Sequence, residues 1–363
     1  MKTILNRALF FAVVWLTVVL CLTKTAVADD LDIDSEDGQS VEIHEALMGF
    51  LFANGYDFNK EYYCSNAYKI WGSDVPDNIV FFVFCENRCI GELVYSSRAN
   101  ASSFYQEHCE IVTELANQEC PIVACSGKGG GLCIVSSKGS FCLWGEDIID
   151  DSFFNTESLE KCAITIRKKR ISFVLYGSRH CQSRLETDES SYLSVPVIAN
   201  ATSPDTEVGL CWLASILSML QYSNKAYGHT TLSLYYYVKM SVYVQNEPYP
   251  RGITPFIEGT FGLFNYPVSF TEAGMTFDSV KTVINTGKPI WVALMTSDLL
   301  DAHAVVLCGY RAFSHTGAFF YRYYRLMDPN CTNYVTVSVS GTGTNFTYDN
   351  GGTIYSLWTS NYK

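Results

Sequence analysis

Basic residues are scarce in this chain of 363 residues, which carries 25 lysines and arginines against 37 aspartates and glutamates. The formal net charge of −12 leaves no basic groove to neutralise phosphates, so we do not expect a nucleic-acid-binding protein. Histidine is rarer still, with six residues, and none is spaced with a cysteine pair as in common zinc sites. Beyond residue 28, no apolar run is long enough to span a bilayer. The sequence therefore predicts no metal, no cofactor and no stable membrane span after removal of the leader.

The first 28 residues follow the pattern of a secretory signal peptide. Lys2 and Arg7 precede an apolar core of about 15 residues, Ala8–Leu22. Ala26-Val27-Ala28 then supplies small residues at a cleavage site. An uncleaved anchor helix is the alternative, but the run is short for crossing a bilayer. We therefore expect a secreted or extracytoplasmic protein.

Charge and cysteine content divide the rest of the chain into two parts. Residues 29–190 hold 27 acidic and 13 basic side chains, a net charge of −14, whereas residues 191–363 hold 10 and 9, a net charge of −1. In a secreted chain, the ten cysteines of the first part predict up to five disulfides of unknown pairing. One bond between Cys308 and Cys331 would leave Cys211 as the odd free thiol. The ten are Cys64, Cys85, Cys89, Cys109, Cys120, Cys125, Cys133, Cys142, Cys162 and Cys181.

The first part, residues 29–186, is expected to be a smaller disulfide-rich α+β domain. Apolar spacing predicts helices over Glu42–Asn54 and over residues 101–118. The polar stretch Gln182–Ser191 is the best domain boundary and a candidate exposed cleavage site. We interpret residues 29–186 either as a prodomain of a zymogen, acting as an intramolecular inhibitor, or as a permanent accessory domain.

In the second part, Cys211 stands where a buried helix is predicted to begin. Apolar side chains follow it at helical spacing through Leu220. A helix N-terminus carries about half a positive charge, which favours thiolate over thiol. The same unpaired N–H groups, including that of Cys211, can receive a developing oxyanion. The alternative is an ordinary buried cysteine on an apolar helix.

Two strands follow with a histidine and an aspartate at their ends. The segment Ala302–Tyr310 reads as a buried strand that begins near His303, and Tyr323–Met327 reads as the next strand. Asp328-Pro329 ends that strand because proline cannot continue the ladder. Asp328 could then orient the far ring nitrogen of His303, with Asn330 as a weaker substitute. A structural histidine and a plain Asp-Pro turn are the alternatives. Residues 341–350 are expected to form a flexible hairpin.

Together these features resemble a papain-like cysteine peptidase, closest to secreted relatives of the bacteriocin leader-processing peptidases. The resemblance covers roughly Tyr192–Lys363. It implies a papain-like fold over residues 187–363, with an N-terminal helix packed on an antiparallel sheet. It also implies Cys211 as nucleophile, His303 as general base and acid, and Asp328 as the orienting group, acting on a protein or peptide substrate. The segments that carry it are Val195-Pro196, Gly209–Ser215, Gly287–Ile290, His303–Val306 and Asp328-Pro329.

One position departs from the family pattern. Such peptidases usually carry, six residues before the cysteine, a glutamine that completes the oxyanion hole; here that position is Asp205, whose carboxylate would repel an oxyanion. Counted from Val195-Pro196, Asn200 falls at the expected place and could donate instead. The departure keeps open a catalytically weak or inactive protein that binds or inhibits. An acyl or peptidyl transferase using the same three residues is a third possibility.

Overall fold

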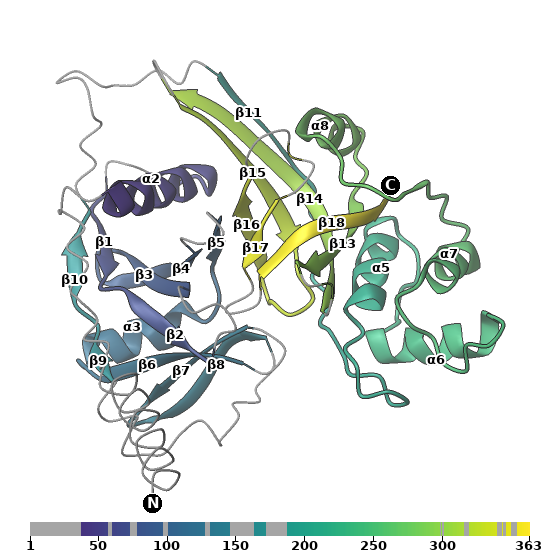
Figure 1. The fold of residues 1–363 in the computed structure, drawn as a ribbon, viewed down its shortest axis with the longest axis horizontal. Helices are drawn as coiled ribbons and strands as arrows, with labels where there is room; N and C mark the ends of the chain where they lie inside the picture. Colours follow the sequence, from purple (N-terminus) through teal and green to yellow (C-terminus); the bar gives the residue numbers. More distant parts are fainter. Residues whose placement is uncertain are drawn as a thin grey trace, which may run out of the picture.

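The computed structural model describes residues 38–56, 60–72, 78–96, 101–127, 131–145, 163–171, 187–297, 299, 301–315, 319–339, 343, 346–349 and 354–363. The predicted signal peptide lies outside these residues. Within them the chain has a mixed α+β fold with six helices and a large, mostly antiparallel sheet (Figure 1). None of these six helices has both the length and the apolar character needed to cross a membrane.

The first region, up to residue 171, is built around five neighbouring strands. The order β10-β1-β3-β4-β5 is antiparallel throughout, and β3 also pairs with β2. A second set, β6-β7-β8, joins through a parallel pairing of β2 with β6. The elements are α2 (Gly38–Ala53), β1 (Tyr62–Ser65), β2 (Tyr68–Trp71), β3 (Asn78–Cys85), β4 (Arg88–Ser96), β5 (Ala101–Tyr105), α3 (Cys109–Asn117), β6 (Pro121–Ser126), β7 (Gly131–Ser136), β8 (Gly139–Gly145), β9 (Ile164–Thr165) and β10 (Lys168–Arg170).

The second region, from residue 187, packs helices on an antiparallel sheet of order β16-β15-β14-β13-β18. Helix α5 lies against β13 and β14, with α6 and α7 packed on α5 (Figure 1). The elements are β11 (Thr187–Tyr192), α5 (Cys211–Tyr222), α6 (Thr231–Ser241), α7 (Thr254–Leu263), β12 (Phe270–Thr271), α8 (Phe277–Asn285), β13 (Ile290–Thr296), β14 (Ala302–His315), β15 (Phe319–Met327), β16 (Tyr334–Ser338), β17 (Tyr348–Asp349) and β18 (Ile354–Tyr362).

The two regions share one sheet. Strand β5 pairs with β16, with Phe104 opposite Thr336 and Ser103 opposite Val337. The sheet of the first region therefore continues into that of the second without a break in hydrogen bonding.

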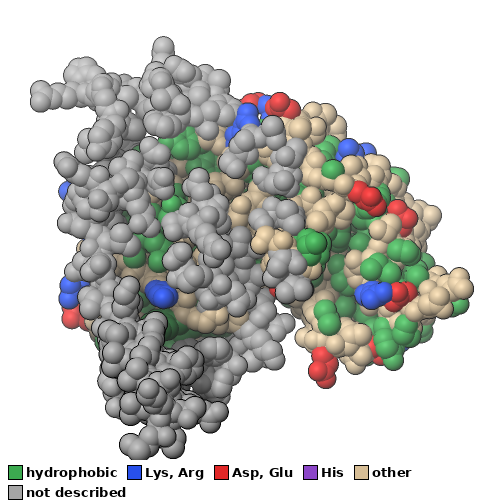
Figure 2. All heavy atoms as spheres, viewed as in Figure 1, with side chains coloured by type: hydrophobic (Ala, Val, Ile, Leu, Met, Phe, Trp, Pro, Cys, Tyr) green, Lys and Arg blue, Asp and Glu red, His purple; other side chains and the backbone are tan. Residues whose placement is uncertain are grey.

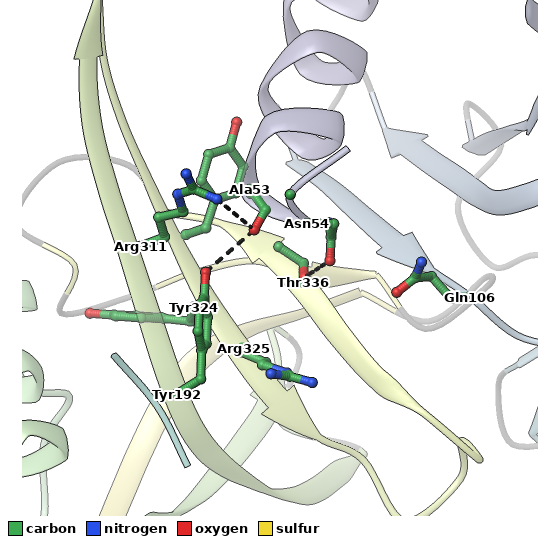
Figure 3. Close-up of a pocket in the computed structure, with 10 residues that line it drawn as sticks. Ala53, Asn54, Gln106, Tyr192, Arg311, Tyr324, Arg325 and Thr336 are labelled. Atoms are coloured by element: carbon green, nitrogen blue, oxygen red, sulfur yellow. Dashed lines mark hydrogen bonds between the residues drawn. The ribbon is translucent and has the colours of Figure 1, made fainter. Parts of the chain in front are cut away.

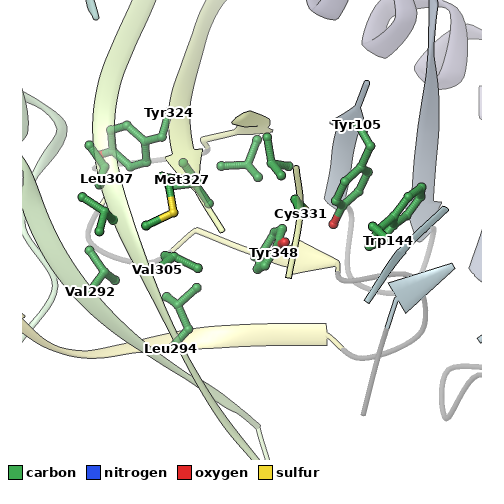
Figure 4. Packing of buried hydrophobic residues seen from close by; sticks show 14 of the residues in the cluster. Tyr105, Trp144, Val292, Leu294, Val305, Leu307, Tyr324, Met327, Cys331 and Tyr348 are labelled. Atoms are coloured by element: carbon green, nitrogen blue, oxygen red, sulfur yellow. The ribbon is translucent and has the colours of Figure 1, made fainter. Parts of the chain in front are cut away.

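They also share one hydrophobic core. Tyr105 and Trp144 of the first region stack with ring centroids 3.9 Å apart, and Tyr105 lies 6.4 Å from the ring of Tyr348. Figure 4 shows Tyr348 and Cys331 between these two aromatic rings and the aliphatic side chains of the second region. Apolar burial therefore stabilises the contact between the regions as well as each region.

The C-terminal end of α2 is held by the second region. Arg311 on β14 donates from Nη1 to the carbonyl of Phe52 at 2.7 Å, which satisfies a carbonyl that a helix end leaves free. The Tyr192 hydroxyl donates to the carbonyl of Ala53 at 3.3 Å, and Thr336 donates to Asn54 at 3.2 Å. A cavity of about 260 Å³ lies beside these contacts (Figure 3).

Of the two helices expected in the first region, one is confirmed and one is partly wrong. The helix predicted over Glu42–Asn54 is α2. Residues 101–118 were expected to be one helix, but 101–105 form β5, because pairing with β4 and β16 overrides the local helical spacing. Within the polar stretch expected at the domain boundary, residues 187–191 belong to β11, paired with β14; residues 182–186 lie outside the described residues.

The disulfides expected from cysteine number are not formed among the described residues. No disulfide joins any two of the eleven cysteines there. The proposed Cys308–Cys331 bond is likewise absent: the Cys308 thiol donates to the carbonyl of Arg325 at 3.4 Å. Both thiols are buried in the apolar core, where a cysteine serves as a small hydrophobic side chain, and parity cannot distinguish this role from pairing.

Candidate active site

Helix α5 begins at Cys211, as predicted. The residue before it, Leu210, has no side-chain oxygen to cap the helix. The N–H groups of Leu213 and Ala214 each donate to the carbonyl of Leu210 at 3.0 Å. The N–H groups of Cys211 and Trp212 donate to no other residue that the structure describes. The half-buried thiol thus stands beside free backbone donors at the positive end of a helix dipole.

The start of α5 is fixed to the sheet by side-chain hydrogen bonds. Ser215 donates from Oγ to the carbonyl of Ala304, the residue after His303, at 3.0 Å. Trp291 on β13 donates from Nε1 to the carbonyl of Trp212 at 3.1 Å. Residues 212–220 of the helix are all buried, as expected for a helix that is apolar on every side. The position of Cys211 relative to β14 is therefore set by a rigid contact.

His303 lies near the start of β14 and is 5% exposed. Its Nε2 atom lies 2.9 Å from Oδ1 of Asp328, which is fully buried at the end of β15. Burial by itself would lower the pKa of His303, but the Asp328 carboxylate and the nearby Cys211 side chain raise it well above its ordinary value. The imidazole therefore favours its charged form despite its burial.

Asp328 is held by three donors. Besides His303, the hydroxyl of Tyr348 donates to Oδ2, and the N–H of Asn330 donates to Oδ1 at 2.7 Å. Burial would raise the pKa of this carboxyl, but the charge and hydrogen bond of His303, with the other two donors, lower it. The shifts of the two partners agree: both favour a buried ion pair.

Cys211 is the third member of this cluster. Its side chain lies close enough to the His303 imidazole to contribute to the rise in the histidine pKa. Because Asp328 occupies Nε2, the ring nitrogen left for Cys211 is Nδ1. The structure thus brings Cys211, His303 and Asp328 together, although they are far apart in the sequence.

Two tyrosines that sequence reasoning missed complete the surroundings of His303. The rings of Tyr348 and Tyr355 lie 6.3 Å and 5.5 Å from the imidazole, and Tyr355 donates to Asp301 at 3.1 Å. The expectation of a flexible hairpin at 341–350 is wrong for Tyr348, which is fully buried on β17. No local signal in a stretch rich in glycine and threonine distinguishes such a tyrosine from a loop residue.

Asn200, the candidate oxyanion donor, lies beside the residue pair that leads into α5. Its Nδ2 atom would lie 3.2 Å from a Cβ placed at Gly209, a tight contact that would shift the amide by a few tenths of an ångström. The same Nδ2 donates to Oδ1 of Asn330 at 2.9 Å, which uses one of its two hydrogens. Asn330 therefore fixes Asn200 and does not contact His303 in place of Asp328.

Asp205, six residues before Cys211, has another role than that of an oxyanion-hole residue. Both of its oxygens bind Lys239 on α6, at 2.8 and 2.7 Å, and Oδ2 also accepts from the Tyr235 hydroxyl at 2.6 Å. The hydrogen bonds from Lys239 and Tyr235 lower the pKa of the carboxyl. The carboxylate is thus neutralised in a loop contact with α6, which the sequence offset from Cys211 could not reveal.

The segment after Asp328 is clamped by the first region. Glu107, 1% exposed, accepts hydrogen bonds from the N–H groups of Thr332 at 3.0 Å and of Asn333 at 2.6 Å, and from the Thr332 hydroxyl. In addition, the N–H of Gly145 donates to the carbonyl of Asn330 at 3.0 Å. A carboxylate and a strand end of the first region therefore fix the loop that follows the aspartate of the triad. Side chains that could together hold a metal ion lie elsewhere, at Cys89, Glu92 and Cys109.

No protein-family model matches this sequence, and no curated protein is significantly similar to it. Any function must therefore be argued from the residues and their geometry.

Proposed function

We propose that the protein is an exported, papain-like cysteine peptidase that hydrolyses peptide bonds through Cys211, His303 and Asp328. One observation carries this proposal: a thiol at an uncapped helix N-terminus interacts with an imidazole whose other nitrogen binds a buried carboxylate. A purely structural cysteine needs neither the free N–H groups nor the buried ion pair. A buried aspartate loses its hydration, so it also needs a partner whose interaction offsets this cost.

The raised histidine pKa supports a defined sequence of proton transfers. In the resting enzyme His303 is a charged imidazolium that holds the proton of Cys211 on Nδ1, and the Cys211 thiolate attacks the peptide carbonyl to form a carbon–sulfur bond. The imidazolium then donates this proton to the leaving amine as the carbon–nitrogen bond breaks. His303 next takes a proton from water, which hydrolyses the thioester and restores the thiolate and the imidazolium. Asp328 keeps the ring oriented and stabilises its charge throughout.

The negative oxygen that forms during attack requires hydrogen-bond donors near Cys211. The N–H of Cys211 is unengaged by any described residue, and the second Nδ2 hydrogen of Asn200 is the side-chain candidate beside it. An inactive relative would be expected if the charge of Asp205 repelled the oxyanion. Because Lys239 and Tyr235 bind that carboxylate, its charge does not argue against activity.

We further propose that the first region is a permanent accessory part of the enzyme and not a removable prodomain. The continuous pairing of β5 with β16, the shared core and the Glu107 contacts support this choice. Removal of the first region would expose the apolar side chains of that core and release the loop after Asp328. A removable prodomain would be expected to cover the active site without holding its residues in place.

The test compares Cys211→Ala with Cys308→Ala, a matched removal of a thiol that is buried away from the triad. Hydrolysis of a fluorescent protein substrate and labelling by a thiol-directed alkylating inhibitor are both measured. We expect Cys211→Ala to abolish hydrolysis and the inhibitor adduct that peptide mapping assigns to position 211, whereas Cys308→Ala retains both as long as circular dichroism shows a folded protein. Hydrolysis that survives Cys211→Ala would rule out the proposed nucleophile. A wild-type protein that is labelled but hydrolyses nothing would favour a binding role.

A further inference from the structure

We propose a metal site in the first region, formed by Cys89, Glu92 and Cys109, that binds a soft divalent ion of the zinc class. The two sulfur atoms and a carboxylate oxygen all lie within 4.8 Å of one another. Sequence spacing does not predict this site, because the residues are not arranged as cysteine pairs. The site is separate from the triad and does not depend on the proposed peptidase activity.

An irregularity in β4 places the first two ligands on one face. Residues three apart on a regular strand point to opposite faces of the sheet. Here Phe84 pairs with Cys89 whereas its neighbour Val83 pairs with Gly91, so Ile90 is an extra residue on β4. This bulge returns Glu92 to the face of Cys89. Bulges of this kind re-aim side chains and are characteristic of functional sites.

The third ligand comes from the helix that covers this face. Cys109 is the first residue of α3, and the side chain of Thr113 ties its backbone to that of Cys89. Thr113 Oγ1 accepts from the N–H of Cys89 at 2.9 Å and donates to the carbonyl of Cys109 at 2.7 Å. The backbones of the two cysteines are thus joined by one hydroxyl group, which fixes the separation of their side chains before any ion binds.

Charge favours a cation over an empty cluster. Glu92 is fully buried, and its contacts are the N–H of Glu107 at 3.4 Å and the Cys109 thiol at 3.8 Å. In the described parts of the chain, no lysine, arginine or histidine forms an ion pair with it. Its neighbour Glu107 is also a buried carboxylate. A buried acid with no basic partner is costly, and a bound divalent ion would compensate its charge.

The donor set determines the class of ion. Two thiolates and one carboxylate suit zinc and similar ions, whereas calcium and magnesium select oxygen ligands. Three protein ligands leave one tetrahedral position for a water molecule. Cys109 is only partly buried, so an ion can reach the cluster from its side. A Cys89–Cys109 disulfide would use both sulfurs but leave Glu92 uncompensated, which is why we favour the metal.

A metal at this position would link β4 to the start of α3. That junction includes His108, held at a φ of 43°, and adjoins Glu107, which binds the segment after Asp328. The ion would therefore stiffen the support of that segment without touching the triad.

The test is zinc binding to the purified full chain, prepared under reducing, anaerobic conditions and stripped with a chelator. Affinity and stoichiometry are measured by competition with a chromogenic chelator, and cobalt substitution is monitored for thiolate-to-metal charge-transfer absorption. We expect one equivalent to bind. Cys89→Ser and Cys109→Ser should each weaken zinc binding by at least about 100-fold, more than loss of an outer partner would. Glu92→Gln should weaken it by about 10-fold or more.

Cys125→Ser, which removes a buried thiol on β6 away from the cluster, is the matched control and should bind zinc like the wild type. If a cysteine variant does not fold, Glu92→Gln and zinc protection of the wild-type thiols from alkylation decide the question. Failure of the wild type to bind one equivalent would overturn the proposal. So would unaltered binding by Glu92→Gln, or a Cys89–Cys109 disulfide in peptide maps of the non-reduced protein.

Discussion

The two regions of this protein bury their carboxylates in different ways. In the second region, Asp328 is paired with the charged imidazole of His303. In the first region, Glu107 forms no ion pair with a described cation and accepts hydrogen bonds from the N–H groups of Thr332 and Asn333 and from the Thr332 hydroxyl. The first arrangement keeps His303, the proposed proton-transfer group, in its charged form. The second arrangement holds a loop in place.

The regions also differ in overall charge. The second region is nearly neutral, and Figure 2 shows apolar side chains among few charged ones over α6 and α7. The first region carries most of the negative charge of the chain. Cys211, His303 and Asp328 therefore lie in the nearly neutral region, while the acidic region supports the loop after Asp328. Five predictions test this division.

The largest effect is expected from separating the regions. Residues 187–363 produced alone should be insoluble or inactive, because the core around Tyr348 and Cys331 would lose the cover of Tyr105 and Trp144. Conversely, cutting the full chain at a protease site introduced between residues 172 and 186 should leave two fragments that co-elute on gel filtration with activity retained. Activation on cutting, with release of the first fragment, would instead identify a prodomain.

Asp328→Asn should lower kcat by about 1,000- to 10,000-fold, because the amide no longer stabilises the imidazolium. Loss of one partner of a buried pair should also cost about 3–5 kcal/mol of unfolding free energy. Tyr348→Phe, which removes only a donor to the carboxylate, should have a smaller effect on both quantities. Equal effects of the two variants would show that Asp328 is structural only.

The pH dependence of this stability difference follows from the two pKa shifts. The raised pKa of His303 adds stability that is fully present below its unfolded value of about 6.5 and is lost as pH rises through the folded value. The lowered pKa of Asp328 adds stability that is present above about 3.9 and is lost as pH falls through the folded value. Urea unfolding should therefore show the largest difference between wild type and Asp328→Asn at pH values of about 4 to 6.5. A difference that grows above that range would contradict the buried ion pair.

Glu107→Gln should have an intermediate effect. The amide presents an N–H₂ group to donors, so the loss of hydrogen bonds should lower the unfolding free energy by about 1–3 kcal/mol. Activity should fall through kcat with little change in KM, because the variant disturbs the segment after Asp328 and leaves substrate contacts intact. Glu114→Gln, an exposed change on α3, is the control and should behave like the wild type. Identical stability and kcat for both variants would mean that the clamp is unimportant.

The smallest effect is expected from Asp205→Asn. Its carboxylate binds Lys239 and Tyr235 and does not act on the reaction, so kcat should change by less than about twofold, far below the effect of an oxyanion-hole residue. An increase of an order of magnitude or more would place its charge near the oxyanion, contrary to the loop contact described for this residue.

The local features of the triad were predictable from the sequence, whereas its surroundings were not. The start of α5 at Cys211, the strand at His303 and the end of β15 before Asp328 all follow from apolar spacing and from a proline stop. The contacts of Tyr348 with Asp328 bring together residues from separate strands, and no spacing rule connects them.

Two expectations relied on counting and were not confirmed. An even number of cysteines predicts up to five disulfides, but none joins two of the described cysteines. An offset of six residues assigned Asp205 to the oxyanion hole, but a loop closed by the bridge between Thr202 and Gly209 directs it to α6. Number and offset carry no information on the path of the chain between two positions.

By itself, the sequence determined the secondary structure at the three triad residues, because helix and strand boundaries depend on nearby side chains and on proline. Only the tertiary structure decided that the acidic first region supports the loop after Asp328, since the pairing of β5 with β16 and the bonds of Glu107 join residues more than 200 positions apart. Such contacts form because buried carboxylates and strand edges must find donors wherever the folded chain supplies them.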